Sequence, residues 1–433
     1  MKGTVPKEVL RTIKFYTLGC KVNQYDTQSI REKFLRQGFQ EIDNGQKADI
    51  YLINTCSVTS TADRKSRQII HSAHRQNPKA QIVVTGCYTE LDSDKISAIP
   101  GVTNIIKNNQ KERMLELLNE DNGPDVRGGI SNFYGRTRVF LKIQDGCDNF
   151  CSYCKVPLVR GRSRSRPIKE IIEEAGRLVK NGFKEIVLSG ICLGAYGKDL
   201  TAQGNLVEVI EALEKIEGLL RIRLSSIEAM DISGGLIAKI KESKKLCPHL
   251  HIPLQSGDDD ILKKMKRNYS RNEYLGLIKK IKKNVPGIAI TTDCLAGFPG
   301  ESEENFQNSL SLIKAILPLK VHIFPYSRRE GTSAASNFKD GVGQQIIKER
   351  LLRLKEIAQE CAFIYKKQFL NKDTPVLIEG RPDSDRNLWE GYTDNYLKVR
   401  LKGLENINLQ NQLISVKIKK IEKDICQAKR LRK

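Results

Sequence analysis

Three cysteines gathered within eight residues are the part of this sequence best suited to chemistry. Cys147, Cys151 and Cys154 form the pattern C-x3-C-x2-C in the string GCDNFCSYC, directly after an apolar run typical of a strand. Three thiolates on one loop can bind three irons of a 4Fe–4S cubane and leave the fourth iron open to an outside ligand. A structural zinc ion would need a fourth cysteine or histidine at close spacing, and the nearby sequence offers none. The spacing therefore predicts a 4Fe–4S cluster with one open iron.

A second set of cysteines is scattered through the N-terminal part of the chain. Cys20, Cys56 and Cys87 close the strings TLGC, INTC and TGC, each at the end of a run typical of a strand. If the three runs are neighbouring parallel strands, their carboxyl ends meet at one edge of the sheet, where ligands bind. Each cysteine taken alone is more simply explained as a small buried apolar residue. Taken together, the three strand-end positions predict a second iron–sulfur cluster.

Parallel sheets must position both cysteine sets, and the sequence supplies strands that alternate with helices. In the N-terminal part, strands are expected at 12–20, 48–56 and 81–87, with helices at 23–38 and 61–77 between them. Such alternation predicts βαβ units and therefore a parallel α/β sheet domain. The turn-rich string EDNGPDVRGG at 120–129 predicts a linker to the next domain.

The same alternation restarts at residue 138 and runs for six units. Helical stretches separate the predicted strands, which are 138–144, 184–190, 220–226, 249–255, 288–297 and 320–326. Six βα units fit a partial α/β barrel rather than the closed barrel of eight. After a long helix at 343–370, alternating β segments with turns predict a small β-barrel of about 60 residues. The expected fold class is α/β, with a parallel sheet domain, a partial (βα)6 barrel and a small C-terminal β-barrel.

Composition and charge narrow the class of partner. The chain has 433 residues, 39% hydrophobic and 29% charged, a balance that excludes disordered and collagen-like chains. No apolar run is long enough to span a membrane and the start lacks a signal-peptide segment, so we expect a cytoplasmic protein. The net charge of +22 indicates a polyanionic partner, with nucleic acid the first candidate. The densest run, KVPLVRGRSRSRPIK at 155–169, carries six cations and no acid, and it either contacts phosphates or forms a solvated basic loop.

The surroundings of the first cysteine set resemble a known enzyme class. C-x3-C-x2-C with an aromatic residue before the last cysteine, after the first strand of a partial barrel, is similar to the radical S-adenosylmethionine superfamily. With the N-terminal cysteines and the C-terminal β segments included, the chain resembles the methylthiotransferases nearly from end to end. The resemblance implies an N-terminal methylthiotransferase domain at 11–120, a radical core at 136–366 and an RNA-binding TRAM domain at 368–431.

Five strings most resemble one branch of that family, the enzymes that act on N6-threonylcarbamoyladenosine in tRNA. They are TLGCKVNQ, GRSRSRP, HIPLQSG, FPYSRREGTSAA and GYTDNYLKV. The implied activity is the addition of a methylthio group to C2 of this nucleoside next to the anticodon. The alternatives are a sibling enzyme acting on isopentenyladenosine in tRNA or on a ribosomal-protein aspartate, and a non-catalytic iron–sulfur RNA-binding protein.

Cofactors, partners and site residues also follow from the resemblance. It implies S-adenosylmethionine and two 4Fe–4S clusters, with Cys147, Cys151 and Cys154 holding the catalytic cluster and the N-terminal cysteines the auxiliary one. The implied partners are a tRNA anticodon stem-loop and a low-potential electron donor, a flavodoxin or ferredoxin, with no membrane involved. Seven residues near the C-x3-C-x2-C motif and at strand ends are implied to contact S-adenosylmethionine: Tyr153, Ser189, Gly190, Ser226, Glu228, Gln255 and Gly297.

Several other residues keep more than one interpretation. Trp389 and Tyr392 either stack on bases, with the interleaved Arg386, Lys398 and Arg400 following the phosphates, or they are core aromatic residues of the small barrel.

Two residues depart from the family pattern. Lys155 replaces a usual aliphatic residue, and it reaches a phosphate, lies in the field of the second cluster or points to solvent. Cys192 stands where histidine or asparagine is expected, and no role is predicted for it. We expect His249 and His251 to pack near their strand rather than bind metal. The remaining cysteines are expected to be buried and inert: Cys247, Cys294, Cys361 and Cys426.

Overall fold

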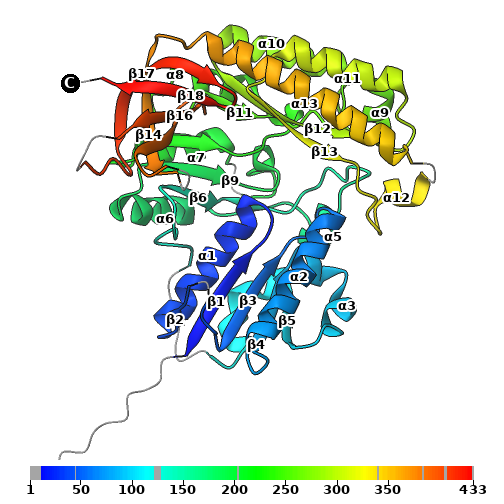
Figure 1. Cartoon of the computed structure of the whole chain (residues 1–433), viewed down its shortest axis with the longest axis vertical. Helices are drawn as coiled ribbons and strands as arrows, with labels where there is room; N and C mark the ends of the chain where they lie inside the picture. The colour runs from blue at the N-terminus through cyan, green and yellow to red at the C-terminus, as the bar shows by residue number, and fades with distance from the viewer. Residues whose placement is uncertain are drawn as a thin grey trace, which may run out of the picture. The chain divides into compact units, whose positions relative to one another are not determined.

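The protein is described by a computed structural model that covers residues 11–43, 45–120, 128–201, 204–338, 341–382, 385–403 and 407–431. The chain divides into two compact units (Figure 1). One contains the residues up to Asn132 together with Lys155–Gly161, and the other contains Phe133–Cys154 and the residues from Arg162 onward. The predicted linker at 120–129 lies mostly outside the described residues. No helix in the described part of the chain is long and apolar enough to cross a membrane.

The first unit is built on a parallel sheet of five strands. The strands lie in the order β2-β1-β3-β4-β5, and every neighbouring pair is parallel. Their bounds are β1 Thr12–Thr17, β2 Gln40–Glu41, β3 Ile50–Thr55, β4 Gln81–Gly86 and β5 Val102–Ile106. The helices are α1 Lys21–Arg36, α2 Ser60–Gln76, α3 Ser93–Ser97, α4 Met114–Leu117 and α5 Val156–Arg160, with 3-10 turns η1 Cys87–Glu90 and η2 Asn108–Arg113.

Strand β3 shows why this sheet positions its carboxyl end well. All six of its residues are buried, and the four apolar ones at 50–53 face alternately toward two separate apolar clusters. Leu52 packs in the cluster that contains Phe34 of α1, whereas Tyr51 packs in the cluster that contains Ile70 of α2. Because both faces are covered, the first four residues of the strand form a continuous apolar run rather than an alternating pattern, and only the last two are polar. The end of β3, where Cys56 follows, is therefore held from both sides.

The second unit begins with six strands in chain order. One sheet has the order β10-β9-β6 and another β11-β12-β13, and the single bridges Ile222↔Leu246 and Ser226↔His251 join them. The order β6-β9-β10-β11-β12-β13, parallel throughout, is the partial barrel that six βα units predict. The bounds are β6 Arg138–Lys142, β9 Glu185–Ser189, β10 Arg221–Leu224, β11 His249–His251, β12 Ala289–Ala296 and β13 Lys320–Pro325, with a short hairpin of β7 Gln144–Asp145 and β8 Arg164–Ser165.

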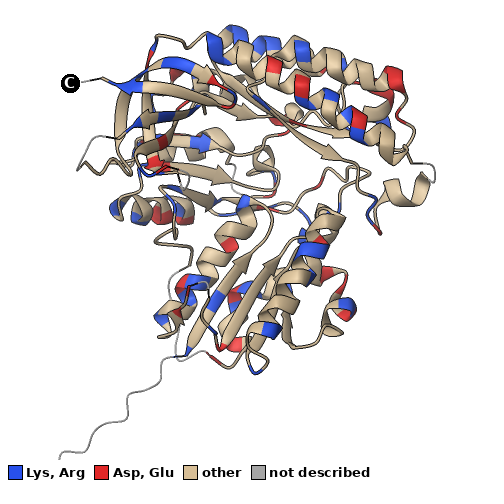
Figure 2. Cartoon of the chain, in the orientation of Figure 1, with Lys and Arg blue, Asp and Glu red and all other residues tan. Residues whose placement is uncertain are grey.

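Helices connect and accompany these strands. They are α6 Ile168–Lys180, α7 Leu206–Glu214, α8 Gly234–Glu242, α9 Asp259–Lys264, α10 Arg271–Asn284, α11 Glu303–Ile316, α12 Ser333–Asn337 and α13 Gln344–Lys367, with 3-10 turns η3 Leu193–Ala195 and η4 Ala229–Asp231. Reciprocal caps start two of them, Ser270 with Glu273 for α10 and Ser302 with Asn305 for α11. Basic and acidic residues are interspersed along α10, α11 and α13, as on a solvated helix face (Figure 2).

The chain ends in a closed β-barrel with the strand order β14-β15-β16-β18-β17, which confirms the expected small barrel. Its strands are β14 Asp373–Gly380, β15 Leu388–Thr393, β16 Lys398–Lys402, β17 Leu413–Glu422 and β18 Ile425–Arg430. Alternate residues of β15 and β16 point inward, and Trp389, Val399 and Leu401 are buried in one core cluster. Trp389 is therefore a core residue, and the base-stacking interpretation is wrong for it.

A buried group of charges connects this small barrel to the amino-terminal ends of the partial-barrel strands. Glu185 is fully buried and accepts a 2.7 Å hydrogen bond from Arg223, while Arg221 and Arg138 lie 3.6 and 3.9 Å away. Arg223 also donates to the carbonyl of Asp394 at 2.8 Å. The arginines thus bind Glu185 and the small barrel at the same time.

The aromatic residues on this side of the small barrel take part in the same contact. Tyr392 lies 4.4 Å below the Arg138 guanidinium, measured to the ring centroid, and stacks on Tyr396. Tyr396 in turn packs against His249, with the two ring centroids 4.6 Å apart. Tyr392 therefore packs against the partial barrel, and His249 packs beside its strand as expected.

Candidate functional site

The cysteines of the C-x3-C-x2-C motif lie on the loop after β7, and residues 147–154 are called the radical loop from here on. Cys147, Cys151 and Cys154 are all partly exposed. Ser152 anchors the loop, because its N–H donates to the Met265 carbonyl at 3.0 Å and its hydroxyl to the Lys264 carbonyl at 2.8 Å. Three thiols on a loop pinned at its centre are arranged to bind a group that is itself partly open to solvent.

One buried cation faces this loop. The Arg267 guanidinium donates to Cys151 Sγ at 3.3 Å and also pairs with Glu228. Burial raises the pKa of the Cys151 thiol, and the charge of Arg267 opposes that rise. A nearby guanidinium stabilises thiolate sulfur, which is the form that binds metal. The sequence reasoning missed Arg267, since nothing in its spacing from the cysteines marks it.

Cys192 lies beside this set rather than apart from it. The interaction between the two thiols lowers the pKa of Cys147 and raises that of Cys192. Asn149 Nδ2 and Asp231 Oδ2 both lie 3.6 Å from Cys192 Sγ. Cys192 is thus a neighbour of Cys147, a position that the sequence did not reveal.

The implied cofactor residues on the first strands do lie at strand ends. Ser189 ends β9 and is buried, with its hydroxyl donating back to the Val187 carbonyl at 3.2 Å. At Gly190, a Cβ would come within 2.8 Å of Gln144 Oε1, so a larger residue would displace that side chain. Ser226 follows β10 and bridges to His251 on the next strand.

The remaining implied cofactor residues are held by specific contacts. Glu228 pairs with Arg267, so it lies next to Cys151 rather than alone at a strand end. Gln255 adopts the left-handed conformation with φ of 64°, and its backbone N–H donates to the Asp293 carbonyl at 2.9 Å. Tyr153 packs against an apolar cluster that includes Phe298, and burial raises its pKa well above the usual value.

Gly297 begins the GFPGE turn after β12 and has a clear reason to be glycine. Its φ is +80°, and a Cβ there would lie 2.6 Å from Ile347 Cγ1. Its N–H donates to Glu301 at 2.7 Å, and Glu301 is buried in an ion pair with Arg350 at 2.7 Å. The turn is therefore fixed by a buried ion pair that the sequence motif did not predict.

The second cysteine set lies at the carboxyl ends of neighbouring strands, as expected. Cys20 precedes α1, Cys56 follows β3 and Cys87 follows β4. A Cβ on Gly19 would lie 3.0 Å from Cys56 Sγ, so the turn before Cys20 passes directly against Cys56. Cys56 and Cys87 are buried, whereas Cys20 is exposed. The three residues line one edge of the sheet with an open side at Cys20.

Cations of the same unit surround this edge. Arg160 of α5 hydrogen-bonds Cys87, and it binds Asn23 and lies 3.6 Å from Asp26. Burial raises the pKa of the Cys56 thiol to about 12, with Cys87 and Cys20 adding to the rise and Arg160 opposing it. Buried thiols that shift one another's pKa are neighbours, and Arg160 favours their ionised form.

Both sets suit a cluster better than a single ion. In the described part of the chain, no three cysteine sulfurs lie within 4.8 Å of one another. A tetrahedral zinc ion with Zn–S bonds of about 2.3 Å would hold its sulfurs about 3.8 Å apart. The donor chemistry of three thiolates with an adjacent guanidinium therefore fits an iron–sulfur cubane at each place.

The basic run at 155–169 is not a uniform phosphate-binding stretch. Lys155 is buried and pairs with Asp92 at 3.8 Å, and Arg160 is buried against α1. Arg166 binds Glu174 at 2.7 Å. Only Arg162 and Arg164 of the alternating arginines are exposed. Arg166 fits neither interpretation of the basic run, phosphate contact or solvated loop, because the buried carboxylate of Glu174 binds it.

The surface of the C-terminal barrel offers a basic hollow beside Trp389. The Arg381 guanidinium carbon lies over the Trp389 ring, 4.5 Å from the ring centroid. The hollow is lined by Arg381, Pro382, Arg386, Trp389, Ile407, Asn408 and Gln410. In contrast, Lys398 and Arg400 both pair with Glu390, so they form an ion-pair network on the strand face.

Two family models match the chain. The model described as the Radical SAM superfamily matches residues 141–313, and that described as the Uncharacterized protein family UPF0004 matches residues 12–107. The first range contains the radical loop and most of the partial barrel, and the second contains Cys20, Cys56 and Cys87.

Full-length relatives carry two kinds of name. The threonylcarbamoyladenosine tRNA methylthiotransferase MtaB of Bacillus subtilis is 41% identical over 95% of this chain and 94% of its own length. The tRNA-2-methylthio-N(6)-dimethylallyladenosine synthase of Clostridium tetani is 34% identical over 93% of each chain. Among solved structures, the radical S-adenosylmethionine methyltransferase TsrM of Kitasatospora setae, with cobalamin and a [4Fe-4S] cluster bound, has a TM-score of 0.53 at 13% identity, over 76% of this chain and 77% of that one. This likeness shows a shared fold.

Proposed function

Since this chain belongs to the radical S-adenosylmethionine methylthiotransferase family, we propose that it adds a methylthio group to C2 of N6-threonylcarbamoyladenosine next to the anticodon of tRNA. The observation that carries the proposal is the similarity along 95% of the chain, at 41% identity, to a relative named for that nucleoside. Isopentenyladenosine is the second candidate substrate, because a relative named for dimethylallyladenosine is 34% identical over similar coverage.

The chemistry of the substrate explains the need for a radical enzyme. The hydrogen on adenine C2 sits on an sp² carbon with no useful acidity, so general base catalysis cannot activate it. S-Adenosylmethionine bound at a 4Fe–4S cluster supplies the carbon radical that this bond requires. In this proposal Cys147, Cys151 and Cys154 hold that cluster, and Arg267 balances part of the thiolate charge.

Backbone at the strand ends is proposed to hold the cofactor. The backbone at Gly190 packs closely against Gln144 and that at Gly297 against Ile347, and the buried Glu301 fixes the turn that presents Gly297. Tyr153, Ser189, Ser226, Glu228 and Gln255 complete the proposed set.

The N-terminal unit is proposed to supply the sulfur. Cys20, Cys56 and Cys87 would hold the second 4Fe–4S cluster, and Arg160 offsets its negative charge. Because Cys20 is exposed, one side of this cluster would be accessible, so that sulfur could pass from it to the substrate. We propose the domain bounds 11–120, 136–366 and 368–431 for the sulfur-donating, radical and RNA-binding parts.

The RNA contact is proposed to use exposed cations in two regions. Arg162 and Arg164 extend from the segment after the radical loop. Strands β17 and β18 carry the exposed Lys419 and Lys429. We further propose that the reaction takes place in the cytoplasm and that a flavodoxin or ferredoxin provides the electrons.

Nucleoside mass spectrometry of tRNA tests the substrate. In a strain that lacks this protein, methylthio-threonylcarbamoyladenosine should disappear while methylthio-isopentenyladenosine stays unchanged. The wild-type gene should restore the modification, and a gene with Cys147→Ala should fail to restore it. Loss of the isopentenyl product instead would establish the second candidate.

A further inference from the structure

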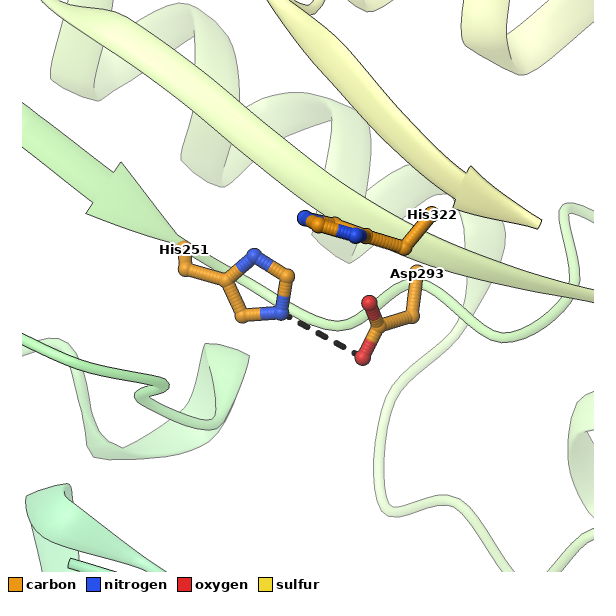
Figure 3. Close-up of side chains that lie close together, drawn as sticks. All are labelled: His251, Asp293 and His322. Carbon is orange, nitrogen blue, oxygen red and sulfur yellow. Dashed lines mark ion pairs between the residues drawn. The ribbon is translucent and has the colours of Figure 1, made fainter. Parts of the chain in front are cut away.

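Three polar side chains from neighbouring strands point toward one another on the β11–β13 sheet. They are His251 on β11, Asp293 on β12 and His322 on β13 (Figure 3). His251 Nε2 lies 3.3 Å from Asp293 Oδ2, and the rings of His251 and His322 meet edge to face with centroids 5.5 Å apart. All three are partly exposed, and their polar atoms lie within 4.8 Å of one another. We call these residues the His–Asp–His cluster.

The His–Asp–His cluster lies on the inner face of the partial barrel. On β12, Thr292 Oγ1 lies 3.2 Å from the Tyr274 hydroxyl of α10, so the helix layer covers that face of the strand. Side chains alternate along a strand, so Thr291 and Asp293 face the opposite way, into the barrel. Their neighbour His251 faces the same way, because its Nδ1 lies 3.0 Å from Thr291 Oγ1.

Thr291 also fixes the direction of His251. Its hydroxyl lies 3.0 Å from His251 Nδ1 and 3.0 Å from His249 Nε2. With Nδ1 occupied in this way, the other ring nitrogen of His251 points toward Asp293. The imidazole is therefore oriented before any ligand arrives, which is the usual condition for a specific polar contact.

Backbone register places the cluster at the height of the proposed cofactor residues. His251 is bridged to Ser226, and the N–H of Ile227 donates to the His251 carbonyl at 3.0 Å. On the other side, the N–H of Gln255 donates to the Asp293 carbonyl at 2.9 Å. Ser226 and Gln255 are both proposed to contact S-adenosylmethionine, so the cluster adjoins the place where the reacting base must enter.

The polarity of the cluster decides what kind of group fits against it. An isopentenyl substituent would remove water from two imidazoles and a carboxylate without offering any hydrogen bond, which is unfavourable. A threonylcarbamoyl substituent carries a carboxylate, a hydroxyl and N–H groups. A site that hydrogen-bonds such groups strongly rejects analogues that lack them.

On the premise that the proposed function holds, we propose that His251, Asp293 and His322 form the subsite that recognises the threonylcarbamoyl group of the substrate. The imidazole of His322 donates to the substrate carboxylate. Asp293, oriented by His251, accepts from the hydroxyl or an N–H of the same group. The cluster selects this nucleoside over isopentenyladenosine at the same catalytic centre.

A test can isolate the carboxylate interaction by combining one variant with one change in the substrate. Fully reconstituted holoenzyme is assayed on two anticodon stem-loop RNAs, one with threonylcarbamoyladenosine and one with its neutral methyl ester. For wild type, kcat/KM should fall about 10- to 100-fold on the ester, the range for losing a charge-assisted hydrogen bond. On the natural RNA, the kcat/KM of His322→Leu should fall by about this same factor relative to wild type. On the ester, the kcat/KM of His322→Leu should be little lower than that of wild type. His322→Asn, which keeps a donor, should lose less than His322→Leu.

Controls keep a failed fold or a failed cluster from being mistaken for support. Iron content and the formation of 5′-deoxyadenosine should be unchanged in the His322 variants. His71→Leu, which changes an exposed histidine of α2 far from the cluster in sequence, should retain the wild-type preference for the acid over the ester.

Three results would overturn the assignment. If His322→Leu lowers kcat/KM by the same factor on the ester RNA as on the natural RNA, His322 does not contact the carboxylate. A divalent metal ion that is bound stoichiometrically besides iron and is lost in His322→Leu would make the cluster a 2-His-1-carboxylate metal site instead. Equal turnover of the isopentenyl and threonylcarbamoyl RNAs by wild type would remove the selection itself. If wild type forms product only on the isopentenyl RNA, it is the proposed function that fails.

Discussion

Arg160, six residues beyond the last cysteine of the radical loop, hydrogen-bonds Asn23 at the start of helix α1 and lies 3.6 Å from Asp26. The segment Lys155–Gly161 consequently packs as part of the N-terminal unit, although it follows Cys154 of the other unit in the chain. Arg160 also hydrogen-bonds Cys87. The residue that leads away from one cysteine set is thus a positive neighbour of the other set.

Replacing Arg160 should weaken the N-terminal cluster selectively. In Arg160→Gln, the charge that opposes thiolate repulsion is lost, so iron bound after anaerobic reconstitution should fall from about eight per chain toward four. Iron and sulfide analysis measures this directly. Arg162→Gln is the matched control, since Arg162 is 74% exposed and pairs only with the exposed Asp148 at 3.3 Å among the ion pairs described. Equal iron contents in the two variants would contradict the assignment.

Removing the N-terminal thiols should separate sulfur insertion from radical formation. A triple variant with Cys20, Cys56 and Cys87 changed to Ala should keep about four irons per chain and still cleave S-adenosylmethionine when reduced. It should form no methylthio product on tRNA. The reverse variant, with Cys147, Cys151 and Cys154 changed to Ala, should lose cleavage altogether. Cleavage by that second variant would show that the two sets have been assigned the wrong roles.

The buried carboxylate of Glu185 should make a large contribution to the free energy of unfolding. Glu185→Gln leaves Arg223, Arg221 and Arg138 with less compensating charge in a buried place, and removing one partner of such a group costs about 3–5 kcal/mol. The free energy of unfolding in urea measures the loss. Glu379→Gln removes a more exposed partner of Arg138 and should cost about 1 kcal/mol or less. Similar losses in both variants would rule out a special role for Glu185.

The same carboxylate predicts a sign for the effect of acid. Burial alone would raise the pKa of Glu185, but Arg223 and Arg138 outweigh it and hold the pKa below the usual 4.5. Its contribution to stability is therefore complete above pH 4.5 and is lost as the pH falls through the lower pKa of the folded state. Unfolding free energies measured from pH 6 downward should decline more steeply for wild type below pH 4.5 than for Glu185→Gln. Parallel curves would argue against this linkage.

Charge reversal on the C-terminal barrel should weaken tRNA binding by removing cations that neutralise phosphates. Lys419 and Lys429 are exposed on β17 and β18, and both are changed to Glu in one double variant. The binding constant should fall, and its dependence on salt should become shallower by about 0.7–0.9 for each phosphate that is no longer neutralised. The control is Lys355→Glu, which reverses the charge of one exposed lysine on α13. An unchanged salt dependence in the double variant would place the RNA elsewhere.

Much of the architecture was predictable because it depends on local patterns. The apolar strands with intervening helices predicted three of the five strands of the first sheet and all six strands of the partial barrel within a few residues. The sequence reasoning missed β2 Gln40–Glu41 and β5 Val102–Ile106. The first is only two residues long, and the second contains the polar pair Thr103 and Asn104 within its apolar run.

The sequence by itself determined the two cysteine sets, the alternation that places them at strand ends, and the resemblance that connects them to a reaction. Such features are visible in a sequence because they depend on residue type and local spacing. Which charges serve each site was decided only by the tertiary structure. Arg160 was expected to be part of an outward basic run and is buried beside Cys87, and Cys192 lies against Cys147.

The His–Asp–His cluster shows the same division most clearly. His251 was expected to pack by its strand and not to bind a metal ion, and nothing in the sequence linked it to Asp293 or His322. These residues lie on three strands separated by helices, so only the register between the strands brings them together. Long-range register depends on the packing of whole sheets and helices, and no local sequence pattern contains it.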